Sequence, residues 1–282
     1  MHRIIKRIAV LALAVPALWS CRSWILEDRT DCPGFLFFEF VDRQSLDDAG
    51  YMYVEAMDAA NGSFLNRDTT TVGAMAKKEY YMPVTKVEVA EVFGASGFNR
   101  SQVENHSQWV IEEGEDGDPL YRFSARVEAS GESAVVPVEM TKEYSTVTVR
   151  FKMPEGYGVD GRFPFYIIVT SNTCGLDIQS GAPVRGAYRF QPEETQDGLF
   201  QFTVPRQADQ SLMLEIWAKE GMYEEEGHLD DLMLWTFLKQ VEGFNWSLKN
   251  IPDLTIDIDY VRSKVVIYVK DWQIGTQINY EI

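Results

Sequence analysis

Apolar and polar residues alternate along much of the chain. In the stretch "STVTVRFKM", Val147, Val149 and Phe151 point one way, while Thr148 and Arg150 point the other. The stretch "LTIDIDY" near the C-terminal end repeats this pattern. A period of two is typical of a β-strand that has one buried face and one solvated face. Both stretches are therefore predicted to be strands.

Further strands are predicted by the same pattern, and they are short and separated by clusters of Gly, Pro, Asn and Asp. They cover residues 35–40, 51–57, 86–92, 120–127, 163–170, 199–204, 212–218, 232–239 and 265–269. The stretch 101–113 is the one candidate for a helical turn. Many short strands at regular spacing favour β-sandwiches over a parallel α/β sheet. We therefore expect an all-β fold.

Two sandwiches fit the number of strands better than one. The stretch "AVVPVEMTKEYSTV" has the pattern of one strand, a short connection and a new strand, which places a boundary near Met140. The predicted units are an N-terminal β-sandwich at 34–140 and a C-terminal β-sandwich at 141–282. Each has an ordinary domain size.

The first residues have the layout of a secretory signal. A basic start is followed by an apolar run at 8–18, which is too short to cross a bilayer. The sequence Leu18-Trp19-Ser20-Cys21 then resembles the lipobox of bacterial lipoproteins. This resemblance implies a signal peptide at 1–20 and a tether at 21–33, with acyl chains such as palmitate on Cys21. An ordinary secretory signal that happens to end in cysteine is the alternative.

The charge balance limits the kinds of partner. The chain has 26 basic and 43 acidic residues. Removal of the signal takes away Arg3, Lys6 and Arg7, which leaves 23 basic residues. The net charge of the remaining chain is then about −20. Nucleic acid requires a positive surface, so it is not expected as a partner. Membrane attachment would depend on acyl chains rather than on charge. The apolar content of 45% excludes a wholly disordered chain.

Catalytic and metal-binding motifs are not found in the sequence. His106 and His228 lie in no recognisable metal or nucleophile motif, and the chain has no H-E-x-x-H, G-x-S-x-G or phosphate-binding glycine loop. The clusters "EEGEDGD" and "YEEEG" lack EF-hand spacing and are interpreted as solvated loops, with a loose calcium site as the alternative. No enzyme activity, metal or cofactor is expected. A glycoside hydrolase with paired carboxylates is the weakest of the hypotheses.

Two groups of residues leave alternatives open. Cys32 and Cys174 would form a bridge in an oxidising compartment, or they are two separate thiols. Four tryptophans would line a sugar-binding platform or belong to the cores; they are Trp217, Trp235, Trp246 and Trp272. A surface glycan-binding lipoprotein is therefore a second functional hypothesis.

Both ends of the chain resemble the FimB-type fimbrial anchor subunits of type V pili. In "EDRTDCPGFLFFEF", Asp28, Arg29, Cys32 and Pro33 match the acidic stretch that precedes the first strand of that family. The family's closing strands, with an Asp-Trp pair, are matched by "DLTIDIDYVRSKVVIYVKDWQIGTQINYEI". Gly34 departs from the pattern because a second cysteine is common at that position. Any cysteine pairing taken from the family therefore does not transfer.

The resemblance implies two tandem transthyretin-like β-sandwiches on a lipid anchor in the outer membrane. Such a protein holds the base of the fimbria at the cell surface, limits its length and takes part in cell adhesion. Its partners are stalk pilin subunits, which are joined by β-strand addition. A subunit that keeps its own first strand offers no groove to a donated strand, so growth would stop there.

The C-terminal tail is the predicted pilin contact. In "QINYEI", Ile278, Tyr280 and Ile282 alternate with polar residues, as a donated or pairing strand requires, and Trp272 precedes them. An ordinary last strand of the protein's own sandwich is the alternative.

Localisation and modification are suggested by short motifs. Arg22 stands where an aspartate would retain a lipoprotein in the inner membrane, so the absence of aspartate favours the outer membrane. Glu27 and Asp28 follow the lipidated cysteine, and acidic residues in this region favour surface exposure. Asp68-Thr69-Thr70 resembles a short bacterial O-glycosylation sequon, with Thr69 as the acceptor.

Overall fold

The computed structural model describes residues 32–43, 46–99, 101–104, 107–152, 162–221, 227–239, 244–259, 264–269 and 278–281. Nearly all of their regular structure is β-strand, which confirms the all-β prediction. The two helices in these ranges have five residues each, α2 (Val72–Ala76) and α3 (Leu234–Leu238). Within the same ranges, no helix is long and apolar enough to cross a membrane.

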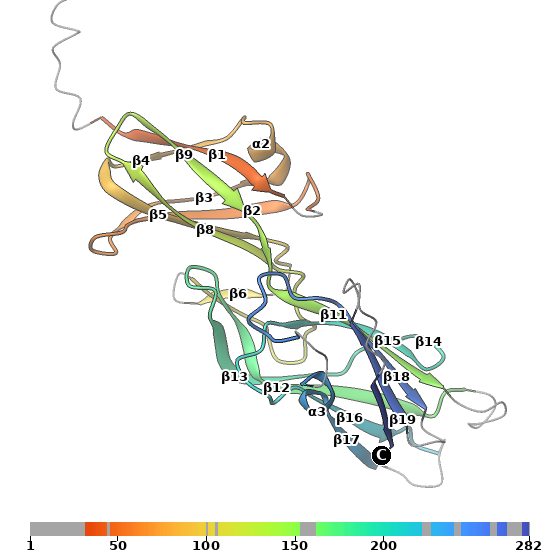
Figure 1. The fold of residues 1–282 in the computed structure, drawn as a ribbon. Helices are drawn as coiled ribbons and strands as arrows, with labels where there is room; N and C mark the ends of the chain where they lie inside the picture. The colour runs from red at the N-terminus through yellow and green to blue at the C-terminus, as the bar shows by residue number, and fades with distance from the viewer. Residues whose placement is uncertain are drawn as a thin grey trace, which may run out of the picture.

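The first sandwich consists of two sheets packed face to face (Figure 1). Sheet A has the strand order β4 (Tyr81–Val84), β1 (Gly34–Asp42) and β9 (Ser133–Glu139). Sheet B has the order β10 (Thr141–Lys142), β8 (Tyr121–Ala129), β5 (Val87–Ser96), β2 (Tyr51–Asp58) and β3 (Phe64–Thr71).

Alternate residues of the two sheets form the first core. Leu36 and Phe38 point inward from β1, and Val54 and Val92 point inward from sheet B. Phe38 also meets Phe123 of β8, with ring centroids 6.4 Å apart in an edge-to-face arrangement. The alternation that predicted these strands thus places their apolar side chains between the sheets.

The second sandwich has a larger core between two six-stranded sheets. Sheet D has the order β14 (Glu194–Gln196), β15 (Leu199–Pro205), β11 (Tyr144–Lys152), β18 (Leu254–Asp259), β19 (Lys264–Val269) and β20 (Ile278–Glu281). Sheet C is built from β17 (Gly227–Met233), β16 (Met213–Ala218), β12 (Phe165–Asp177), β7 (Gln108–Val110) and β6 (Gln102–Glu104), and β13 (Pro183–Phe190) also pairs with β12.

The strands β6 and β7 connect the two sandwiches. They lie in sequence between β5 and β8 of sheet B, yet β7 pairs with β12 of sheet C, with Trp109 opposite Leu176. The predicted helical turn at 101–113 is therefore wrong. The domain bounds 34–140 and 141–282 remain a prediction, because this segment takes part in a sheet of the second sandwich.

One other sequence prediction is wrong. Residues 232–239 were expected to form a strand, but β17 ends at Met233 and helix α3 follows directly. The stretch "LMLWTFLK" is apolar without strict alternation. Such a run does not distinguish a buried strand from a short buried helix.

Candidate functional site

The first strand is in the middle of its own sheet. β1 runs antiparallel to β4, with Phe37 opposite Tyr81, and parallel to β9, with Phe37 opposite Val135. Leu36 and Phe38 are buried beneath the sheet. The central position of sheet A is therefore filled by β1 of the chain itself.

The last described strand lies at the edge of its own sheet. β20 runs antiparallel to β19, with Tyr280 opposite Val265 and Ile278 opposite Ile267. Among the described residues, no strand pairs with the outer side of β20. An unpaired edge of this kind is a template for adding a strand from another chain. Trp272 and Ile282 lie outside the described residues.

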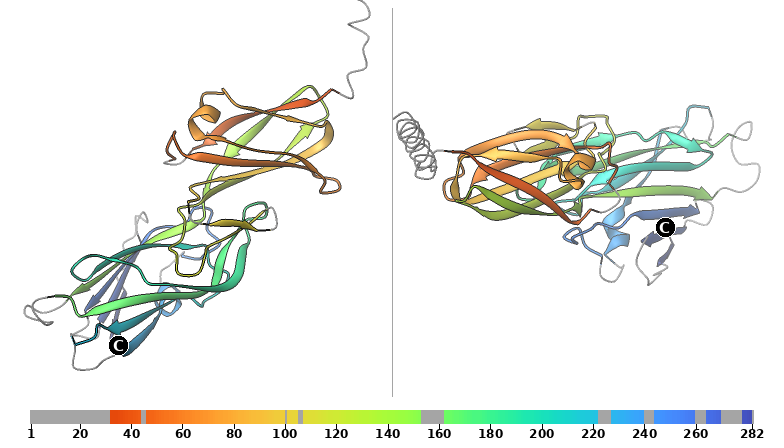
Figure 2. Two further views of the ribbon diagram at one scale, coloured as in Figure 1. Left: turned by 180° about the vertical axis from the view of Figure 1, so that it is seen from behind. Right: turned by 90° about the horizontal axis from the view of Figure 1, so that it is seen from above.

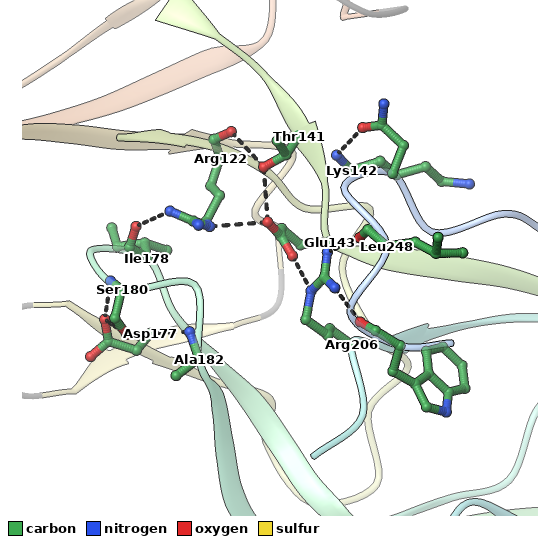
Figure 3. A network of polar contacts seen from close by, with 12 residues as sticks. Arg122, Thr141, Lys142, Glu143, Asp177, Ile178, Ser180, Ala182, Arg206 and Leu248 are labelled. Carbon is green, nitrogen blue, oxygen red and sulfur yellow. Dashed lines mark hydrogen bonds and ion pairs between the residues drawn. The ribbon is translucent and has the colours of Figure 1, made fainter. Parts of the chain in front are cut away.

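A buried carboxylate connects the two sandwiches (Figure 3). Glu143 lies between β10 and β11 and is 3% exposed. Arg122 of β8 donates from Nε to Glu143 Oε1 at 3.0 Å, and Arg206, which follows β15, donates from Nε to Oε2. The Thr141 hydroxyl also lies 2.8 Å from Oε1. One carboxylate thus receives two guanidinium groups, which offsets the cost of burying its charge.

The same two arginines reach backbone carbonyls of the second sandwich. Arg206 donates to the carbonyl of Trp246 and, at 2.8 Å, to that of Leu248. Arg122 donates to the carbonyl of Ile178 at 3.3 Å, in the turn between β12 and β13. In this turn Gly181 has a φ of +74°, and a Cβ there would lie 2.1 Å from Arg122 Nη2. Glycine therefore leaves the space that the arginine occupies.

The groups of this junction hold the two sandwiches together. Its groups are cations, carbonyls and a fully paired carboxylate, around a hollow of about 470 Å³. The Thr141 hydroxyl donates to Glu143, but both oxygens of that carboxylate are also held by the guanidinium groups of Arg122 and Arg206. The junction fixes the orientation of one sandwich relative to the other.

A second polar cluster lies on the outer face of sheet B. Tyr53 donates its hydroxyl hydrogen to the buried Glu55, and Arg67 donates from Nε to the same carboxylate at 2.8 Å. Burial, followed by the hydrogen bond to Glu55, raises the pKa of Tyr53 well above its ordinary value. Glu55 and Arg67 border a hollow of about 550 Å³, which Gln179 of the second sandwich also lines.

The two cysteines are not brought together. Cys32 is exposed just before β1, whereas Cys174 is buried in β12, and no disulfide joins them. The structure therefore contains the separate thiols and not the bridge. Thr69 lies exposed on β3, where its backbone N–H donates to Asp68 Oδ1 at 2.8 Å. Cys21 lies outside the described residues.

The tryptophans of the described ranges do not form an exposed row. Trp246 is buried, while Trp217 and Trp235 are half-buried. Trp217 stacks on Tyr166, with ring centroids 6.1 Å apart, and donates to Glu215 at 3.0 Å. Within the described part of the chain, no group of three His, Cys, Asp or Glu side chains is placed to hold a metal ion.

Comparison with known proteins shows similarity of fold. No family model and no curated protein matches the sequence. Among solved structures, a Bacteroides thetaiotaomicron protein for which polysaccharide binding has been suggested is 12% identical, with a TM-score of 0.63 over 89% of this chain and 98% of that one. The fimbrial anchor protein Mfa2 of Porphyromonas gingivalis is 12% identical, with a TM-score of 0.58 over 87% and 100%. A fimbrial assembly protein of Parabacteroides distasonis is 10% identical, with a TM-score of 0.51 over 88% and 98%.

These similarities cover nearly the full length of each solved structure. At such identities they show the fold alone, and the fold is that of fimbrial anchor and assembly proteins. Both the sequence at the two ends of the chain and the fold therefore resemble those of fimbrial anchor proteins.

Proposed function

We propose that this protein is the lipid-anchored base subunit of a type V fimbria, held in the outer membrane and exposed at the cell surface. The position of β1 carries the proposal. Because β1 fills the centre of sheet A, a strand donated by another subunit cannot take that position. Polymerisation by strand exchange would end at such a subunit, which gives a physical reason for a limit on fimbrial length.

The edge of sheet D is the proposed contact with the stalk. A pilin strand would pair with the outer side of β20, in the region of Ile278 and Tyr280, and Trp272 and Ile282 would extend the contact. Main-chain hydrogen bonds would supply much of the affinity, as in other cases of β-strand addition. The Glu143 junction supports this role, because a base under load requires a fixed connection between its two halves.

Attachment is proposed to depend on Cys21. Several acyl chains hold a protein firmly in a membrane, since each buried methylene contributes about 0.8 kcal/mol. Cells that produce a Cys21→Ser variant are expected to release their fimbriae into the medium. Electron microscopy of cells and culture supernatants would measure this. Short fimbriae that stay attached to Cys21→Ser cells would contradict the proposal.

Pull-down from detergent-solubilised outer membranes tests the stalk contact. The full-length protein is compared with a chain that ends at Lys270 and with an Ile278→Lys, Tyr280→Lys variant, which places charge on the edge strand. Stalk pilin is expected to co-purify with the unsubstituted full-length chain and to be lost from both of these altered forms. A Thr195→Lys variant on β14, the opposite edge of the same sheet, is the control and should retain pilin. Equal recovery of pilin with all forms would exclude the β20 contact.

A surface glycan-binding lipoprotein is the second candidate. It is favoured by a hollow of about 570 Å³ beside the junction, whose wall includes Tyr51, Phe98, Tyr121 and Tyr144. Aromatic rings with a few polar groups are common in sites for small ligands. Titration of the protein with soluble polysaccharides, with Tyr51→Ala as the comparison, would test it. Equal binding by both proteins would remove this site from consideration.

A further inference from the structure

Sheet A has an exposed apolar outer face. Phe37, Tyr81 and Val135 are 41%, 54% and 58% exposed, and they belong to β1, β4 and β9. The strand register makes them direct neighbours, because Phe37 pairs with Tyr81 on one side and with Val135 on the other. We call these three residues the sheet A patch.

The sheet A patch continues into further apolar residues. The half-buried Phe35 meets the Tyr81 ring edge-to-face at 5.5 Å, and Phe37 lies 6.1 Å from the same ring. Val41, at the irregularity near the end of β1, is also exposed. Exposed charged residues border these apolar ones: Glu39, which pairs with Lys78 at 2.8 Å, and Asp42, which lies opposite the exposed Glu139 of β9. Contiguous apolar surface of this kind usually marks a contact with a protein or a membrane.

Sheet A lies on the side of the first sandwich that is remote from the second sandwich (Figures 1 and 2). The inner side of sheet A packs on sheet B through the first core. The outer side of sheet B in turn carries Tyr53 and Phe93, which pack with Trp109 and Ile178. The second sandwich therefore covers the far side of sheet B and leaves the outer side of sheet A open.

The proposed lipid anchor is close to this face in the sequence. Twelve residues, 22–33, separate Cys21 from Gly34, where β1 begins. At the extended spacing of 3.3–3.6 Å per residue, the chain from Cys21 to Gly34 reaches at most about 47 Å. Acyl chains on Cys21 would thus hold the start of β1 near the lipid at a high effective concentration.

We propose that the sheet A patch rests on the lipid surface to which Cys21 attaches the protein. The proposal depends on the lipid anchoring stated above. Aromatic side chains are favoured at the membrane–water interface, and an apolar face gains free energy by leaving water there. The chain has a formal net charge of −17, so phosphate-bearing headgroups repel most of its surface. The three residues of the sheet A patch carry no charge, so this part of the surface can approach the headgroups.

This contact would orient the whole subunit. Once sheet A lies on the lipid, the second sandwich and the edge strand β20 are directed away from the membrane, because the Glu143 junction holds the two sandwiches together. The stalk contact is then presented to the cell exterior. The acyl chains supply attachment, and the sheet A patch supplies direction.

Lipid-borne quenchers test the contact. The acylated protein carries Cys32→Ser and one new cysteine, either Val135→Cys or Gln201→Cys. It is extracted from outer membranes and labelled at the new cysteine with a solvatochromic dye. The labelled protein is then reconstituted in vesicles of phosphatidylethanolamine and phosphatidylglycerol that carry nitroxide lipid. Val135 lies in the sheet A patch, whereas Gln201 is exposed on β15 of the second sandwich. Quenching at position 135 is expected to be several-fold stronger than at position 201.

Two double variants control for the side chains. Phe37→Ser with Tyr81→Ser should remove most of the quenching at position 135. Tyr51→Ser with Phe64→Ser, which changes exposed aromatic residues on sheet B, should leave it in place. Circular dichroism checks that each protein is folded. All forms should still float with the vesicles, because the acyl chains remain.

The other outcomes overturn the proposal in distinguishable ways. Flotation without quenching at position 135 would keep the lipid anchor and exclude the orientation. A dye shift at position 135 that grows with protein concentration without vesicles would assign the patch to a second copy of the chain. Failure to float would remove the lipid anchor, and the orientation would be lost with it.

Discussion

The two outer faces of the first sandwich carry the same kind of residue with opposite exposure. Phe93 on sheet B is fully buried, while Phe37 on sheet A is 41% exposed. Phe93 is covered because β6 and β7 leave the first sandwich and pair with sheet C of the second, which brings Trp109 against sheet B. Among the described residues, nothing packs in this way on Phe37.

This difference shows that burial here depends on long-range topology. Both phenylalanines lie in strands with an aromatic, apolar sequence, and each points away from the core between sheets A and B. One contributes to the connection of the two sandwiches. The other is open to a partner, which we propose to be lipid.

The largest effect on the free energy of unfolding is expected from removal of the buried Phe93 ring. Phe93→Ala leaves a cavity between sheet B and the second sandwich, and it should lower the free energy of unfolding by about 3–5 kcal/mol. Urea unfolding, followed by tryptophan fluorescence, would measure it. Phe37→Ala is the matched variant and should change stability by no more than about 0.5 kcal/mol. Similar losses in both variants would contradict the comparison.

A slightly smaller effect on the free energy of unfolding is expected at the Glu143 junction, which holds the second sandwich against sheet B. Glu143→Gln removes the charge between Arg122 and Arg206 and leaves the buried Arg206 and the half-buried Arg122 without a counterion, at a cost of about 3 kcal/mol. Small-angle scattering should also show a broader range of distances between the sandwiches. Glu139→Gln is the control, because its ion pair with Lys249 is exposed. It should cost less than about 0.5 kcal/mol, and an equal loss in both variants would show that burial of Glu143 is unimportant.

The sequence predicts the strands better than it predicts their surroundings. Alternation predicted β1, β11 and β18 within two residues at each end, because each has an apolar face on a continuous core. β6 and β7 were missed because each has three residues, too few to show a period. β12, the partner of β7, also lies about 70 residues further along the chain, where no local pattern indicates it.

The site residues differ in the same way. The resemblance carried by "EDRTDCPGFLFFEF" implied a subunit that keeps its own first strand, and β1 lies at the centre of sheet A. The role of Glu143 was not predicted, because its partners Arg122 and Arg206 are 21 and 63 residues away, and nothing in "MTKEYS" marks a buried carboxylate. The exposed ring of Phe37 was also not predicted, since "FLFFEF" is apolar on both of its faces.

A third prediction concerns the polar cluster on sheet B. Tyr53→Phe removes the hydroxyl that donates to Glu55 and should cost about 1 kcal/mol at pH 7. Because the pKa of Tyr53 is raised on folding, its contribution to stability is present below the ordinary tyrosine pKa and declines as the pH rises above it. The loss of stability between neutral and strongly alkaline pH should therefore be smaller in Tyr53→Phe than in the parent. Tyr81→Phe on sheet A is the control, and an unchanged pH profile in Tyr53→Phe would contradict the assignment.

The smallest effect on stability, and the sharpest test of the comparison, is expected from the sheet A patch itself. Phe37→Ser with Tyr81→Ser replaces exposed rings, so the free energy of unfolding should change by no more than about 0.5 kcal/mol per site. In a Cys21→Ser background without acyl chains, the parent should still co-sediment weakly with phosphatidylethanolamine and phosphatidylglycerol vesicles, and the double variant should lose this association. A variant that is destabilised as strongly as Phe93→Ala would show that the patch is covered within the protein. A stable variant that still co-sediments would show that lipid does not recognise these side chains. Retained stability with lost co-sedimentation is the result expected of a face that serves a partner rather than the fold.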